Sequence, residues 1–97
     1  MILSERQTEQ GLLVTVCDAD ALGETFENGS VSLTVTEEFY GGGDADEESV
    51  ADALASASVA NLVGTRSVEF AIEAGFVDEE TVLELDGTLH AQFLRMG

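Results

Sequence analysis

Carboxylate side chains constrain this chain more than any other feature. The sequence holds 20 aspartates and glutamates against 3 basic residues, all arginines, and its formal net charge is −17. Repulsion of this size destabilises a compact chain in dilute buffer, whereas salt near 1 M shortens the Debye length to about 3 Å and screens it. The composition therefore predicts a halophilic archaeal protein that folds in concentrated salt.

The acidic residues are spread along the whole chain instead of forming one run. A concentrated run would indicate a mimic of nucleic acid or a store of divalent cations. Asp44, Asp46 and Glu48 match the first three ligands of a calcium loop. However, Ser49 and Ala55 occupy the positions that need glycine and a bidentate glutamate. We therefore expect a solvated acidic surface and no specific metal site.

Length and hydrophobicity predict one folded domain over residues 1–97. Hydrophobic residues make up 44% of the chain, which is enough for a core. The single cysteine excludes an internal disulfide. The apolar start, MIL, is too short for a signal peptide, and no stretch approaches the roughly 18 apolar residues of a membrane helix. We expect a cytoplasmic protein with no membrane partner.

Strand patterns lie toward both ends of the chain. Leu12–Cys17 is apolar and β-branched, and Val31–Thr36 alternates between apolar and hydroxyl side chains. Asp86–Gly87 is a type I′ hairpin signal between Val82–Leu85 and Leu89–Arg95, and it places His90 opposite Leu83. These patterns predict a mainly antiparallel sheet.

Two helices are expected between these strands. Asp44 and Glu47 have the spacing of a capping box, and the helix that they begin should run to about Ala57. A second helix should begin near Thr65 and stop at Gly75. The order is then ββ–αα–ββ, which predicts an α+β fold whose sheet is covered by two helices.

Cys17 and His90 are the only residues of their types and are compatible with a nucleophile and its base. The alternative is that Cys17 only packs in a buried strand and that His90 is a core histidine whose hydrogen bonds are made within the fold.

The glycines of Gly41–Gly43 resemble a phosphate-binding loop, but no lysine follows and acids occupy the helix start. We expect no nucleotide cofactor. A small enzyme using Cys17, Asp18 or His90 stays as the alternative function.

The non-acidic polar and aromatic residues define a candidate binding surface. His90 and Gln92 lie two residues apart on one strand and so share a face. Arg66 is a cation in the first turn of a helix, where it opposes the helix dipole and needs a carboxylate or an anionic partner. Asn61 belongs to a segment expected to form a polar corner between the helices, and Tyr40 is either an exposed anchor or half-exposed.

Four motifs in this sequence resemble one archaeal family. They are VCDADALGETF (Val16–Phe26), EEFYGG (Glu37–Gly42), ANLVG (Ala60–Gly64) and HAQF (His90–Phe93). In this order they are similar to the domain-of-unknown-function family 424. The resemblance implies a small single-domain archaeal protein and carries over no catalytic residue. We therefore expect a non-enzymatic interaction domain with a protein or ribonucleoprotein partner in the translation or RNA machinery.

Overall fold

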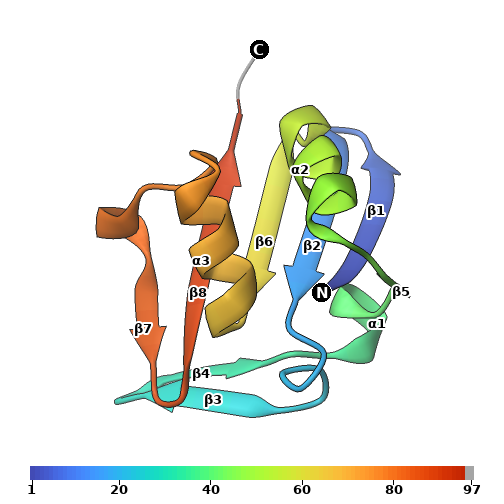
Figure 1. Cartoon of the computed structure of the whole chain (residues 1–97). Helices are drawn as coiled ribbons and strands as arrows, with labels where there is room; N and C mark the ends of the chain where they lie inside the picture. Colours follow the sequence, from blue (N-terminus) through green and yellow to red (C-terminus); the bar gives the residue numbers. More distant parts are fainter. Residues whose placement is uncertain (96–97) are drawn as a thin grey trace.

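A six-stranded sheet organises the computed structural model, which describes residues 1–95 (Figure 1). In chain order the elements are β1 (Ile2–Thr8), β2 (Gly11–Cys17), β3 (Thr25–Asn28), β4 (Val31–Thr34), α1 (Glu37–Tyr40), β5 (Gly43–Asp44), α2 (Glu47–Ser56), β6 (Val59–Val63), α3 (Thr65–Glu73), the 3-10 helix η1 (Glu79–Thr81), β7 (Leu83–Leu85) and β8 (Thr88–Leu94). The strand order is β5-β1-β2-β6-β8-β7, and β3 and β4 form a separate two-stranded ribbon. Every neighbouring pair is antiparallel except β2 and β6, which are parallel. The fold is therefore α+β with a mostly antiparallel sheet.

The sheet has an apolar cluster on each of its two faces. Helices α2 and α3 lie on one face of the sheet (Figure 1). There Leu54 and Val68 join a core with Val14 and Val16 of β2 and Leu62 of β6. On the other face, the β3–β4 ribbon and α1 enclose a smaller cluster: Cys17, Ala21, Val35, Tyr40 and Val63. The larger core lies under the helices because Val14 and Val16 point to that face of β2, while Thr15 and Cys17 point away.

The expected order ββ–αα–ββ is wrong in the middle of the chain. The segment predicted to be a polar corner is β6, a central strand between β2 and β8. Its residues Ala60, Leu62 and Val63 are buried. A strand parallel to β2 becomes possible because α2 carries the chain back across the sheet. Asn61 interrupts the apolar run in sequence, but it points to the face that the helices do not cover.

The helix predictions hold for α3 and are displaced by two residues at the start of α2. The N-cap of α2 is Asp46, whose Oδ1 accepts a hydrogen bond of 2.8 Å from the backbone N–H of Ser49. Hydrogen bonds from Ser49 hold the pKa of Asp46 below its usual value. Asp44 instead pairs with Ile2 in the short strand β5. It therefore cannot begin the helix.

The predicted hairpin at Asp86–Gly87 is present, and His90 lies opposite Leu83. Gly87 has a φ of 91°, but Asp86 keeps a negative φ, so the turn is not of type I′. No helix formed by residues 1–95 is long and apolar enough to cross a membrane.

Candidate functional site

Three rows of paired residues cross the sheet face that α2 and α3 leave uncovered. Residues paired across neighbouring strands share a face, so the register assigns each row. The first row is Ile2, Cys17, Val63, His90 and Leu83. The second is Ser4, Thr15, Asn61 and Gln92. The third is Arg6, Leu13, Val59 and Leu94.

The β1–β2 side of these rows is covered by α1. Thr15 Oγ1 donates a 3.2 Å hydrogen bond to the carbonyl of Phe39, and Thr15 is buried. The guanidinium of Arg6 donates to the carbonyls of Glu38 and Phe39 and lies over the Phe39 ring, 5.7 Å from its centroid. These contacts leave the part over β6, β8 and β7 accessible. We call this part the open face, formed by Val31, Val59, Asn61, Leu83, His90, Gln92 and Leu94.

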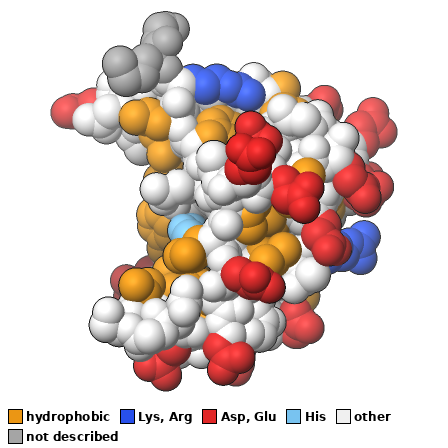
Figure 2. Space-filling model, turned by 90° about the vertical axis from the view of Figure 1, so that its left-hand side faces the viewer, with side chains coloured by type: hydrophobic (Ala, Val, Ile, Leu, Met, Phe, Trp, Pro, Cys, Tyr) orange, Lys and Arg blue, Asp and Glu red, His pale blue; other side chains and the backbone are white. Residues whose placement is uncertain are grey.

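Apolar side chains are concentrated at the open face. The large hydrophobic residues that are exposed within residues 1–95 are Val31, Leu83 and Leu94, at 49%, 39% and 64% exposure, and all three belong to it. A cavity of about 350 Å³ lies between the ribbon and β7–β8. Its lining is Val31, Ser32, Leu33, Thr81, Leu83, Leu85, His90, Ala91 and Gln92. Figure 2 shows hydrophobic side chains gathered beside the histidine at one edge of the molecule. None of the described lining residues is a carboxylate.

His90 is held in one orientation on this face. Its Nδ1 lies 3.0 Å from the carbonyl oxygen of Leu62. A carbonyl only accepts hydrogen bonds, so Nδ1 carries the hydrogen and Nε2 of the neutral ring is left as an acceptor. Every buried side-chain nitrogen or oxygen of residues 1–95 has a partner. Nε2 makes no hydrogen bond within the described chain, so it is not fully buried.

Three of the five residues predicted for binding converge at this site. Asn61 and Gln92 are direct cross-strand partners, and His90 follows in the adjacent row. The predicted shared face of His90 and Gln92 is therefore present. Asn61 joins them only because β6 is a strand, which the sequence interpretation missed.

The prediction that Tyr40 belongs to a binding surface, as an exposed or half-exposed residue, is wrong. It is only 4% exposed, and its ring packs edge-on against Phe39 with centroids 5.0 Å apart. Burial and the nearby Cys17 raise the pKa of Tyr40 to about 12. Tyr40 is buried because it ends the single-turn helix α1, which packs against the sheet. The helix begins at the N-cap Thr36, whose hydroxyl oxygen accepts a hydrogen bond from the backbone N–H of Phe39.

Arg66 lies in the first turn of α3, away from the open face. Its backbone N–H donates a 3.1 Å hydrogen bond to Asp18 Oδ2, and the residue is exposed. Asp18 Oδ1 accepts from the backbone N–H of Ser67 at 2.8 Å and from its hydroxyl at 2.7 Å. Asp18 is thus the cap of α3, supplied from the end of β2. Gly64 occupies the N-cap position with a φ of 122°, and a Cβ there would overlap the Asp18 carboxylate.

The other two arginines have structural contacts. The guanidinium of Arg95 donates to the carbonyls of Leu54, Ala55 and Ala57, where α2 ends, at 2.9–3.2 Å. Arg6 binds carbonyls of α1 in the same manner. Cations are favourable at these positions because carbonyls at the C-terminal end of a helix run short of intrahelical donors. These two arginines are therefore engaged within the fold.

Cys17 and His90 do not form a catalytic pair. Strand β6 lies between them, because Cys17 pairs with Val63 and Val63 pairs with His90. Two strand spacings separate their backbones by about 10 Å. Cys17 is fully buried, and burial together with the charge of Asp18 raises its thiol pKa to about 11. Asp18 itself is occupied as a helix cap, so the sequence-based catalytic alternative has no common site.

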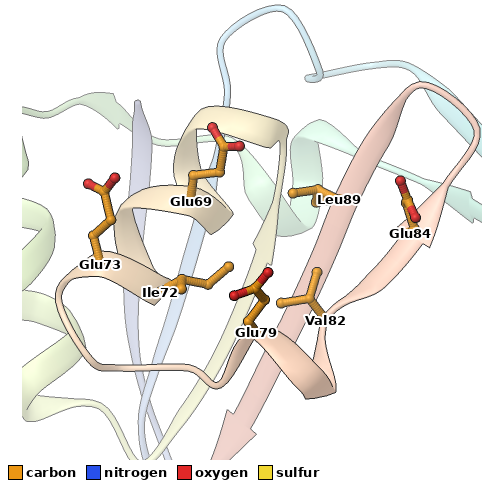
Figure 3. A pocket seen from close by; sticks show the side chains of 7 residues that line it. All are labelled: Glu69, Ile72, Glu73, Glu79, Val82, Glu84 and Leu89. Atoms are coloured by element: carbon orange, nitrogen blue, oxygen red, sulfur yellow. The ribbon is translucent and has the colours of Figure 1, made fainter.

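A second concave region, which the sequence analysis did not predict, lies between α3 and β7–β8 (Figure 3). Its volume is about 510 Å³. Ile72, Val82 and Leu89 form its apolar floor, and Figure 3 shows these three side chains directed into the gap. Four glutamates surround them: Glu69, Glu73, Glu79 and Glu84. This acidic rim disfavours anionic ligands such as phosphate.

Comparisons with known proteins place this geometry in a family. An uncharacterized conserved protein from Methanopyrus kandleri has a similar crystal structure, with a TM-score of 0.78 and 22% sequence identity over 99% of this chain and 94% of that one. This likeness supports a shared fold. A search of curated proteins finds none that matches. The family model described as Protein of unknown function (DUF424) matches residues 5–96, nearly the whole chain, so this protein belongs to the DUF424 family, as its four motifs predict.

Proposed function

We propose that this chain is a non-enzymatic interaction domain that binds another protein through the open face. The observation that carries the proposal is that Val31, Leu83 and Leu94, the exposed large hydrophobic residues of the described chain, all belong to the open face. Contiguous exposed apolar surface is typical of interaction sites. In a chain of net charge −17, the cavity on this face is lined by described residues none of which is a carboxylate.

The partner is proposed to be a protein of the translation or RNA machinery, not the nucleic acid itself. Nucleic-acid binding draws its affinity from cations that contact phosphates. Arg6 and Arg95 are engaged with helix carbonyls, and Arg66 lies away from the open face. Asn61 and Gln92 carry amides instead, which bind the polar groups of a polypeptide. These features favour a protein surface over nucleic acid as the partner.

We propose that this binding takes place in molar salt, in the cytoplasm of a halophilic archaeon. Dispersed carboxylates remain hydrated under those conditions, while salts that are excluded from protein surfaces strengthen apolar association. The open face would then bind more tightly as KCl rises. An electrostatic interface would instead weaken as KCl rises.

The test is crosslinking and affinity capture from cell extract in about 2 M KCl. Wild type is compared with Leu83→Asn and Leu94→Asn, and with Ala74→Asn as a control at the exposed end of α3. Recovery of one protein that survives nuclease treatment and is lost only in the open-face variants supports the proposal. Recovery that nuclease abolishes would assign the partner as RNA and contradict it. Enzymatic turnover that disappears in Cys17→Ala would also contradict it.

A further inference from the structure

The cavity of the open face has the chemistry of a receptor for a single side chain. Its volume of about 350 Å³ is at the lower end of the range for ligand pockets and is large enough for one aromatic side chain of a partner. Leu33, Leu83 and Leu85 line it with apolar atoms. An occupant with an apolar body fills this space without burying an unpaired polar group.

Among the hydrogen-bonding side chains that line this cavity (Ser32, Thr81, His90 and Gln92), the His90 ring is held in place by a hydrogen bond. Because Nδ1 of His90 donates to the Leu62 carbonyl at 3.0 Å, the ring cannot turn freely and its Nε2 is presented as an acceptor. His90 also lines the cavity. The complementary group is a donor at the end of an apolar side chain. A carboxylate would offer no proton to Nε2, and a lysine would place its charge against apolar walls.

We propose that this cavity accepts a tyrosine side chain of the partner protein, with the phenolic hydroxyl donating to Nε2 of His90. Tyrosine combines a large apolar ring with one donor at its tip, and such residues frequently anchor interfaces. The inference rests on the proposed function and deepens it, because it names what the open face recognises. His90 is then the residue that determines specificity.

The probe for this proposal is 4-methylphenol, which reproduces the tyrosine side chain. The matched compound without a donor is 4-methylanisole, in which a methyl group replaces the hydroxyl hydrogen. Both are titrated into the whole protein in 2 M KCl while the backbone amide signals of residues 88–92 are followed by NMR. One hydrogen bond in a partly dry site should make 4-methylphenol bind about 3- to 10-fold more tightly.

Variants separate the hydrogen bond from the apolar contact. In His90→Asn the side-chain amide can keep the donor to Leu62 near the Nδ1 position but provides no acceptor at Nε2. The preference for 4-methylphenol should fall to about 1-fold there, while the Leu62 and Val63 signals confirm that the sheet is intact. Leu83→Asn should weaken both compounds to a similar extent.

Equal binding of the two compounds to wild type would overturn the tyrosine proposal, yet it would leave an apolar docking surface and so the proposed function. Binding of neither compound at residues 88–92 would overturn it as well. Tighter binding of 3-methylindole, the tryptophan analogue, would overturn the choice of tyrosine. Failure of the capture experiment would contradict the proposed function without changing these measurements.

Discussion

Replacing Asp18 should show that a residue distant in sequence begins α3. The carboxylate of Asp18 accepts hydrogen bonds from the backbone N–H groups of Arg66 and Ser67, which lie 48 and 49 positions later in the sequence. A lost N-cap costs about 0.5–2 kcal/mol. Ser67 is fully buried, and leaving its hydroxyl unpaired costs about 1–3 kcal/mol more. Asp18→Ala should therefore lower the free energy of unfolding by about 1.5–5 kcal/mol.

Thermal unfolding followed by circular dichroism in 2 M KCl measures this loss. For a domain of this length, 1 kcal/mol shifts the midpoint by about 4–8 °C. Asp18→Asn keeps one carbonyl oxygen as an acceptor, and we expect it to lose only about 1 kcal/mol. Asp20→Asn, two residues away and exposed, is the control and should change stability by less than about 0.5 kcal/mol. A midpoint for Asp18→Ala equal to that of Asp20→Asn would refute the capping argument.

Four further predictions follow from the fold. Gly64→Ala should destabilise the protein by at least about 1–3 kcal/mol in the same thermal assay, because its φ is 122° and the new methyl overlaps Asp18; a neutral effect would contradict this packing. Arg95→Ala should cost about 1–2 kcal/mol by freeing the carbonyls at the end of α2, and Arg95→Met, which keeps the length without the donors, should not restore it. Stability measured by urea unfolding should fall from pH 9 to 11, because the pKa of buried Cys17 rises from 9.0 to about 11 and the thiol must stay neutral in the fold; Cys17→Ala should remove the decline between pH 9 and 10 and leave the part above pH 10 that comes from Tyr40, whose pKa rises from 10.0 to about 12. Removal of KCl should unfold the chain, and full stability at about 10 mM salt, where the Debye length is about 30 Å, would show that charge repulsion is unimportant.

Elements defined by neighbouring residues were predictable from the sequence. The hairpin at Asp86–Gly87 and the end of α3 before Gly75 depend on local turn residues, and both were placed correctly. Strand β6 was missed because it is short and contains Asn61, whose position becomes reasonable only when the adjacent Gln92 is known. Its parallel pairing with β2 is a long-range property that no local pattern encodes.

The candidate site was predictable in part for the same reason. The shared face of His90 and Gln92 follows from strand alternation within one segment. The burial of Tyr40 depends on how α1 packs over β2, and the apolar character of the open face depends on Val31 and Leu83 meeting from different segments. The role of Asp18 as the cap of α3 could not be predicted, because it depends on the contact between the end of β2 and the start of α3, which are far apart along the chain.

The remote cap of α3 also affects how this protein emerges from the ribosome. The 48 residues that follow Asp18, up to and including Arg66, take roughly 2–10 s to synthesise at usual rates. During that interval the β1–β2 hairpin can form, but the edge of β2 that later pairs with β6 has no strand beside it. An unpaired apolar edge is a site of intermolecular strand pairing. The nascent chain is therefore most prone to aggregation between the completion of β2 and the arrival of β6, and a chaperone that shields this edge would raise the yield of folded protein.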